Sequence, residues 1–554
     1  MHKVVVCSFV YCKKVPLLIC CFISVSRGES CRVKTTTNLY SSLLFFIWVC
    51  FWATACHHSS FSADAVILAI DKGPDNLDPR IGTNSESERI DQLLFNSLVR
   101  RGPQLEILPD LATHWETPDP TTYRFHLRAG VRFHNGQELT SRDVRYTIES
   151  LSNGTINSSK TSTYRVIAGI ETPDDRTLVF HLKEPYASFL WNLTNGAIGI
   201  VPERPGTDFY KSPVGTGPFR FVSNSQEEEV IIEANPTYFG EVPSVQRVQF
   251  KVIPDATTRA LEIRKGSVDV AQNVLSPDFV EVLRKQPHLS VAVTPGTNYG
   301  YIGFNLNDPI VRDKRVRKAI ALAINREEIA KYYWRDLVSL ASSLLPPNHW
   351  AYEKDVITYA YDPDEAVRLL DEAGFKDPDG AGPATRFKLI FKTSTEESSR
   401  QVAAIIQQQL NRVGIEIDLR SNEFGTFYGD IVHGNFQMFT LRWVGGNNDP
   451  DLFERVFHSQ QVPPKGWNRG HYHNPRIDEL TELARREPDQ AKRKLAYSEI
   501  QKIVADDLPY ISLWYFKNVS LYSERISNMT LSPAGDYEFL RSIRLDDGLP
   551  ISQQ

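Results

Sequence analysis

Beyond residue 56, this 554-residue chain contains no cysteine. Its seven cysteines all lie near the start, at Cys7, Cys12, Cys20, Cys21, Cys31, Cys50 and Cys56. The later part of the chain therefore cannot form internal disulfide bonds, build a cysteine metal site or use a catalytic thiol. A long chain that keeps thiols out of its folded part is typical of an oxidising compartment, where a stray thiol can mispair.

The chain also lacks a strong excess of charge and, from Ala65 onward, a long apolar run. Its 62 Lys and Arg residues against 67 Asp and Glu give a formal net charge of −5, which offers no basic footprint for nucleic acid. Hydrophobic residues at 41% and charged residues at 23% are the balance of an ordinary globular protein. The length predicts two or three domains, and we expect no nucleic-acid partner.

Sequence motifs of several enzyme classes are missing as well. There is no Gly-x-x-x-x-Gly-Lys phosphate loop, no Gly-x-Ser-x-Gly elbow and no His-Glu-x-x-His helix. A secreted hydrolase with dispersed carboxylates stays open, although no residue pattern favours it. These motifs therefore give no positive indication of an enzyme, and the chain carries no phosphate-binding loop of an ATPase.

The histidines and acids do not follow a recognised metal motif either. The histidine pairs at 57–58 and 471–473 have no third ligand at a known spacing. A run that resembles a calcium loop starts at Asn447, but Leu452 stands where that loop requires glycine. The sequence thus predicts neither a metal nor another cofactor.

The first 55 residues are predicted to be a leader that is removed from the mature protein. Its apolar core, residues 43–52, is too short for a stable membrane anchor but fits the core of a signal peptide. Charged residues interrupt the segment before this core, so we expect translation to start at a non-AUG codon for Val33, with a start at Met1 as the alternative.

Small residues at 53–55 precede Cys56, as at the cleavage site of bacterial lipoproteins. Cys56 is therefore the predicted lipidation site, and residues 56–64 form a short polar tether. The alternative is ordinary Ala-x-Ala cleavage that releases a soluble protein, because lipoboxes usually carry leucine three residues before the cysteine.

After the tether, strand and helix patterns follow one another irregularly. Alternating apolar residues predict strands at 66–70, 123–127, 131–133, 178–182, 415–419 and 510–516. Helical spacing and end signals predict helices that begin near Thr140 and that cover 316–324, 363–374 and 402–413. Such a succession implies sheets covered by helices, and the last strand could rejoin an earlier sheet.

Several short segments stand along the chain in a specific order and spacing. The segments are Leu94-Phe95-Asn96-Ser97-Leu98-Val99, Leu108-Pro109-Asp110-Leu111-Ala112, Val131-Arg132-Phe133-His134-Asn135-Gly136, Gly215-Thr216-Gly217-Pro218-Phe219, Tyr301-Ile302-Gly303-Phe304-Asn305 and Asp449-Pro450-Asp451. Together they resemble the bacterial extracellular solute-binding proteins of family 5, the dipeptide, oligopeptide and nickel receptors of ABC importers. The resemblance covers nearly the whole chain after the leader.

The resemblance implies an α/β, two-lobed periplasmic-binding-protein fold of the type II-like class, with an extra domain inserted in one lobe. Carried onto this chain, it places domain I at residues 65–92, 183–293 and 508–554. Domain II is expected at 93–182 and domain III at 294–507. Two lobes joined by a hinge can close around a ligand and present the closed form to a membrane partner.

The best candidate for ligand contact is the stretch that begins at Arg442, because it combines aromatic surface, flexible backbone and polar side chains. The expected ligand-binding residues are Tyr299, Tyr301, Arg442, Trp443, Gly446, Asn447, Asn448, Asp449 and Trp467. The alternative interpretation is a structural loop in which the aspartates cap helices and turns. For the two tyrosines, packing within a sheet is the equally open alternative.

One position departs from the family pattern. In peptide-binding relatives an aspartate pairs with the ligand's α-ammonium group, and the matching position here is Gly446. A buried ammonium group without a carboxylate would be costly. Either Asp449 or another acid replaces that aspartate, or the natural ligand is not an ordinary peptide with a free amine.

The resemblance implies an extracytoplasmic substrate-binding component that captures a peptide or peptide-like ligand and delivers it to a permease. Its partners would be the permease and ATPase subunits of an ABC importer, in separate chains. We expect a monomer in the periplasm or at the cell surface, lipid-anchored to the membrane. The alternatives are a receptor for another solute, such as a nickel chelate or a sugar, and a sensor or chaperone.

Overall fold

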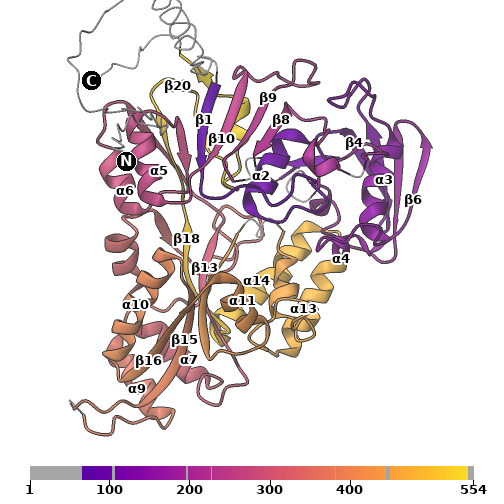
Figure 1. Cartoon of the computed structure of the whole chain (residues 1–554). Helices are drawn as coiled ribbons and strands as arrows, with labels where there is room; N and C mark the ends of the chain where they lie inside the picture. Colours follow the sequence, from indigo (N-terminus) through magenta and orange to yellow (C-terminus); the bar gives the residue numbers. More distant parts are fainter. Residues whose placement is uncertain are drawn as a thin grey trace, which may run out of the picture. The chain divides into compact units, whose positions relative to one another are not determined.

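Three large β-sheets organise the part of the chain that the structure describes (Figure 1). The structure is a computed structural model, and it describes residues 65–102, 106–194, 198–206, 208–225, 227–380, 382–444 and 449–546. The predicted leader, Cys56 and the whole tether at 56–64 lie outside these residues. Among the helices described, none is both long and apolar enough to cross a membrane.

The first sheet has seven strands in the order β12-β19-β11-β1-β10-β9-β8. The strands are β1 (Ala65–Ile70), β8 (Phe219–Ser225), β9 (Glu229–Ala234), β10 (Arg247–Val252), β11 (Val270–Gln272), β12 (Leu289–Thr294) and β19 (Asn518–Ser523). The helices of this region are α2 (Ser85–Leu94), α5 (Ala256–Lys265) and α6 (Pro277–Leu283). The strand predicted at 66–70 is confirmed as β1. Because successive side chains of a strand point to opposite faces, Val66 and Leu68 pack in one hydrophobic core and Ala69 packs in another.

The second sheet is antiparallel and has four strands in the order β4-β5-β7-β6. They are β4 (Ala112–Asp119), β5 (Thr122–Leu127), β6 (Ile167–Asp174) and β7 (Thr177–Leu182), with the short pair β2 (Val99–Arg101) and β3 (Ile107–Pro109) and the helices α3 (Ser141–Ser152) and α4 (Thr161–Tyr164) in the same region. The predicted helix after Thr140 is confirmed, and the Asp143 carboxylate accepts a hydrogen bond from the Thr140 N–H. The strand predicted at 131–133 is wrong: only one isolated bridge forms there, between Arg132 and Glu138.

The third sheet has six strands in the order β14-β18-β13-β17-β15-β16. They are β13 (Tyr299–Phe304), β14 (Val338–Leu340), β15 (Phe387–Ser394), β16 (Ile415–Asn422), β17 (Met438–Trp443) and β18 (Tyr510–Phe516). Its helices are α7 (Lys314–Ala323), α8 (Arg326–Glu328), α9 (Pro363–Glu372), α10 (Glu397–Asn411), α11 (Phe424–Val432), α12 (Leu452–Phe457), α13 (Pro475–Arg486) and α14 (Gln490–Asp507). The predicted ends of α9 and α10 are confirmed, since Gly374 and Gly414 have φ of +92° and +82° just after them.

The chain passes between the seven-stranded and six-stranded sheets in two places that lie side by side. Residues 295–298 connect β12 to β13, and Lys517 alone connects β18 to β19. On one side β12 pairs with β19, and on the other β13 pairs with β18, both antiparallel. Strand β18 thus belongs to the six-stranded sheet, although residue 508 was the expected start of the last part of domain I. We propose that this part of domain I begins after Phe516.

Two of the short segments that carry the family resemblance, residues 131–136 and 215–219, meet at His134. The Nδ1 atom of His134 accepts a hydrogen bond from the N–H of Gly215 at 3.2 Å, and its Nε2 lies 3.1 Å from the carbonyl oxygen of Gly217. A Cβ atom at Gly215 would overlap the carbonyl oxygen of Leu94, so this close backbone approach requires glycine. Burial lowers the pKa of His134 to about 4 and outweighs the hydrogen bond to Gly217, which raises it.

We predict that His134 makes the folded protein sensitive to acid. Because the folded pKa is depressed, the unfolded chain binds more protons between pH 6.5 and pH 4, so this stability is present above pH 6.5 and is lost as the pH falls toward 4. The His134→Gln variant should lose about 2–3 kcal/mol less than the parent between pH 7 and pH 4. Urea unfolding at a series of pH values measures this, with His473→Gln as an exposed control. Equal pH slopes for the parent and His134→Gln would contradict the prediction.

Candidate functional site

A cavity of about 380 Å³ lies at the ends of strands β17 and β18, beside the first turns of α10 and α11. Its described lining is rich in aromatic and polar side chains: Lys72, Trp334, Ser394, Glu396, Ser398, Ser399, Phe424, Phe427, Tyr428, Arg442, Trp443, Arg469, Trp514 and Phe516. Lys72 follows β1 of the seven-stranded sheet, whereas the other residues belong to the six-stranded sheet, its helices and the loops that connect them. The cavity is therefore bounded by parts of both sheets.

Trp443 forms the centre of the aromatic wall. Its ring lies parallel to that of Tyr301, with centroids 6.3 Å apart and an interplanar angle of 11°. The guanidinium carbon of Arg469 lies 4.8 Å from the centroid of the Trp443 ring and 5.3 Å from that of Tyr428. The position of Trp443 is thus set by β17, of which it is the last residue, and by the Arg469 guanidinium that lies against its ring.

The guanidinium of Arg469 is buried, with only 3% of the residue exposed. Its Nη1 donates to the hydroxyl of Tyr301 at 3.0 Å, and its Nη2 donates to the hydroxyl of Tyr428 at 3.1 Å. Among the residues that the structure describes, no carboxylate lies within ion-pair distance of it. A buried charge without a counter-charge is costly, so the stacking rings and the two hydroxyls are its compensation within the described chain.

Glu396 is the only acid among the described residues that line the cavity. It precedes α10 and accepts hydrogen bonds from the backbone N–H groups of Ser398 at 3.2 Å and Ser399 at 2.8 Å. Desolvation raises its pKa, but the hydrogen bond from Ser398 and the charge of Arg442 outweigh this and leave the pKa lowered. Glu396 is therefore ionised and already engaged as the N-cap of a helix.

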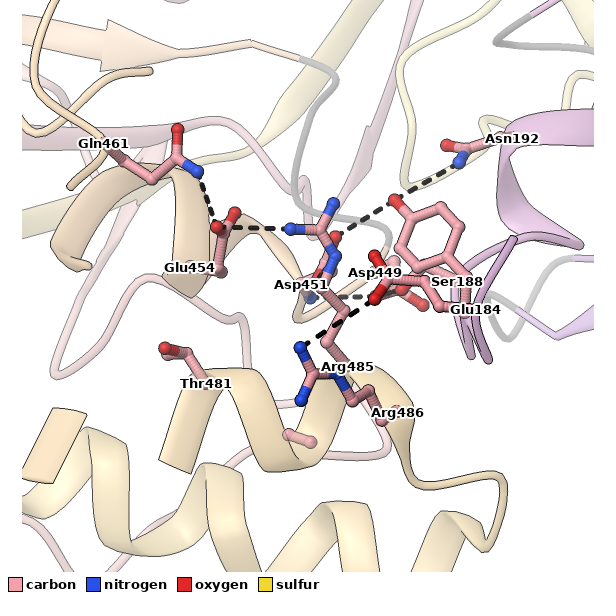
Figure 2. Close-up of polar contacts among 12 residues, drawn as sticks. Glu184, Ser188, Asn192, Asp449, Asp451, Glu454, Gln461, Thr481, Arg485 and Arg486 are labelled. Atoms are coloured by element: carbon pink, nitrogen blue, oxygen red, sulfur yellow. Dashed lines mark hydrogen bonds and ion pairs between the residues drawn. The ribbon is translucent and has the colours of Figure 1, made fainter. Parts of the chain in front are cut away.

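Asp449 does not line the cavity but joins a polar network between two distant segments (Figure 2). Its Oδ1 accepts from the hydroxyl of Ser188 at 2.7 Å and from Arg493 Nη2 at 3.2 Å. Beside it, the hydroxyl of Tyr186 donates to Asp451 at 3.1 Å. Both aspartates are thus engaged by side chains of the protein, and ligand contact by Asp449 stays a prediction.

The other predicted site residues fall into three groups. Arg442 and Trp443 line the cavity. Tyr299 and Tyr301 are 2% and 0% exposed within β13 and stand behind the wall rather than in it, while Trp467 contacts Trp443 with centroids 5.2 Å apart. Gly446, Asn447 and Asn448 lie outside the described residues, so their role as ligand residues stays a prediction.

Several cavity residues escaped the sequence interpretation. Phe424 and Tyr428 stand at i and i+4 on α11 with stacked rings 5.9 Å apart, so they share one face of the helix. The four-residue spacing is visible in the sequence, but the sequence does not indicate whether that face of the helix lines a cavity or packs in the core. Arg469 and Glu396 carried no local motif at all.

One cluster of potential metal ligands exists in the described residues, away from the cavity. His114, Glu116 and His126 on β4 and β5 place their ligand atoms within 4.8 Å of one another. The two imidazole rings stack with centroids 4.3 Å apart, and Glu116 also pairs with Arg124. The expected absence of a metal stays a prediction.

Comparisons with known proteins match this chain over most of its length. The profile described as "Bacterial extracellular solute-binding proteins, family 5 Middle" matches residues 106–463. The dipeptide-binding protein of Escherichia coli is 26% identical over 510 residues, which are 87% of this chain and 95% of that protein.

Two solved structures extend the comparison to the fold. The oligopeptide-binding protein AppA of Bacillus subtilis, in complex with a nonapeptide, has 26% identity and a TM-score of 0.74, and the match covers 87% of this chain and 99% of that one. NikZ of Campylobacter jejuni, in complex with Ni(L-His), has 26% identity and a TM-score of 0.75, with 86% and 98% covered. The predicted fold class, an α/β two-lobed periplasmic-binding-protein fold, is confirmed by these likenesses.

We predict that Asp449 supports the fold and not the ligand. Asp449→Ala removes the carboxylate from the buried Arg493, so it should lower the free energy of unfolding by about 3 kcal/mol. Asp278→Ala, which breaks an exposed pair with Arg335, is the control and should cost less than about 1 kcal/mol. Urea unfolding gives both values; an Asp449→Ala protein of parental stability that no longer binds ligand would reverse the assignment.

Proposed function

Because this chain belongs to the bacterial extracellular solute-binding proteins of family 5, we propose that it captures a peptide or peptide-like ligand for an ABC importer. The observation that carries this proposal is the cavity bounded by Lys72 on one side and the six-stranded sheet on the other. A ligand held there contacts both sheets at once. It would be delivered to a permease, with the permease and the ATPase in separate chains.

The chemistry of the cavity supports a peptide-like ligand. Its rings offer apolar surface for side chains, and the hydroxyls of Ser398, Ser399 and Thr440 offer polar partners for amide groups. A ligand that touches both sheets stabilises their closed arrangement, and a permease can recognise that arrangement. We propose that the ligand leaves chemically unaltered.

Phe424 tests the cavity as the binding site, since it is 55% exposed while lining the cavity. Phe424→Ala should weaken binding about tenfold, because a ligand that covers this ring gains apolar burial, while the unfolding free energy stays within about 1 kcal/mol of the parent. Calorimetry would use the ligand released from natively purified protein and identified by mass spectrometry.

The control is Leu495→Ala, which truncates a 72% exposed side chain outside the described cavity lining. It should bind like the parent. Parental affinity in Phe424→Ala would place the ligand elsewhere, and a nickel chelate or a sugar in the mass spectrum would replace the peptide with one of the alternative solutes.

We further propose that the protein works as a monomer outside the cytoplasm, attached through a lipid on Cys56. The support is the small-residue run that ends at Cys56 and the polar tether at 56–64. Cys56→Ser should abolish incorporation of a radiolabelled fatty acid and move the protein from the membrane fraction to the soluble one. An unlabelled parent protein, or a labelled Cys56→Ser variant, would refute the anchor and favour simple cleavage.

A further inference from the structure

The charges of the cavity do not balance. Three cations line it, Lys72, Arg442 and Arg469, against one described acid, Glu396. Glu396 is held at the start of α10 by Ser398 and Ser399, and Lys72 lies 3.8 Å from Glu86. The two guanidinium groups therefore remain without an ion pair among the residues that the structure describes.

Arg469 is the more informative of the two guanidinium groups, because it is 3% exposed and lies in the wall itself. A guanidinium has five N–H donors, and the described chain engages two of them, through the hydroxyls of Tyr301 and Tyr428. Both acceptors are neutral, and the Trp443 ring occupies one face of the group. The side chain is held rigidly, desolvated and still short of a counter-charge.

A rigid and weakly hydrated guanidinium is suited to a planar anion, because its fork of donors matches the two oxygens of a carboxylate. Arg442, the second cation, is held over the Phe516 ring with its guanidinium carbon 4.9 Å from the centroid. An anion that enters the cavity would thus meet positive charge from the wall and from the rim. A cationic ligand group would meet only Glu396, whose oxygens are already hydrogen-bonded.

We propose that Arg469 is the anchor of a carboxylate-binding subsite, so that the ligand of this protein carries a carboxylate that docks beside Trp443. This rests on the proposed function and narrows it to peptide-like molecules with a free carboxylate, at the C-terminus or on an acidic side chain. The ligand supplies the counter-charge that the described wall lacks.

The experiment compares matched ligands on the intact mature protein by calorimetry. The probes are the tripeptides Ala-Phe-Ala and Ala-Glu-Ala, each with a free C-terminal carboxylate and as the C-terminal carboxamide, together with glutarate and glutaramide. Loss of the carboxylate should weaken binding at least about tenfold, the scale of a charge-assisted hydrogen bond. Carboxamide Ala-Glu-Ala retains affinity only if the side-chain carboxylate is the docked group, which separates the two sources.

Variants assign the effect to Arg469. Arg469→Gln should remove the difference between carboxylate and carboxamide, and Arg469→Lys should keep part of it because the charge remains. The matched control is Arg455→Gln, which removes a guanidinium that stacks on Trp467 at 5.3 Å but does not line the described cavity. If Arg469→Gln does not fold, the comparison of ligands on the parent protein still decides.

Equal affinity of the parent for carboxylate and carboxamide peptides would overturn the subsite and leave peptide capture intact. Binding of glutarate but of no peptide would support the subsite and overturn the peptide ligand. Absence of binding by every probe would overturn both. A carboxylate preference that survives in Arg469→Gln would move the subsite away from Arg469.

Discussion

The buried carboxylate of Asp449 joins the chain that follows the four-stranded sheet to helix α14. Trp443 ends β17 in the cavity wall, and six residues later Asp449 is held by Ser188 and Arg493. Trp443 is held by stacked aromatic rings, and Asp449 is held by a buried ion pair. Ser188 follows the four-stranded sheet, whereas Arg493 belongs to α14, so the same carboxylate ties distant parts of the chain together.

Part of the local structure could be predicted from the sequence, where the signals were local. Alternating apolar residues predicted β5, β7 and β16, and the glycines after α9 and α10 predicted where these two helices end. The strand expected at 131–133 failed because the turn at Asn135 and Gly136 leaves room for a single bridge rather than a ladder. The partner sheet of β18 depends on which distant strand it meets, and no local pattern contains that information.

The candidate site was predicted less completely, for a physical reason. Residue type could indicate that Trp443 and Arg442 suit a ligand, and both line the cavity. Residue type could not indicate that the Asp449 carboxylate is paired with Arg493, because the two residues are 44 positions apart in the sequence. Arg469 was not predicted because its importance lies in the absence of a carboxylate among its described neighbours. Only the three-dimensional arrangement shows which residues those neighbours are.

The double crossing between the two larger sheets has a mechanical consequence. The crossings run side by side as continuations of paired antiparallel strands, β12 with β19 and β13 with β18, so they act as one two-stranded ribbon. Such a ribbon bends easily across its plane but resists shear, because sliding one strand along the other would break both ladders. Any change of angle between the sheets has to be absorbed by the torsions of residues 295–298 and Lys517. A ligand that contacts both sheets would therefore act on these few linker torsions when it selects one arrangement of the sheets over another.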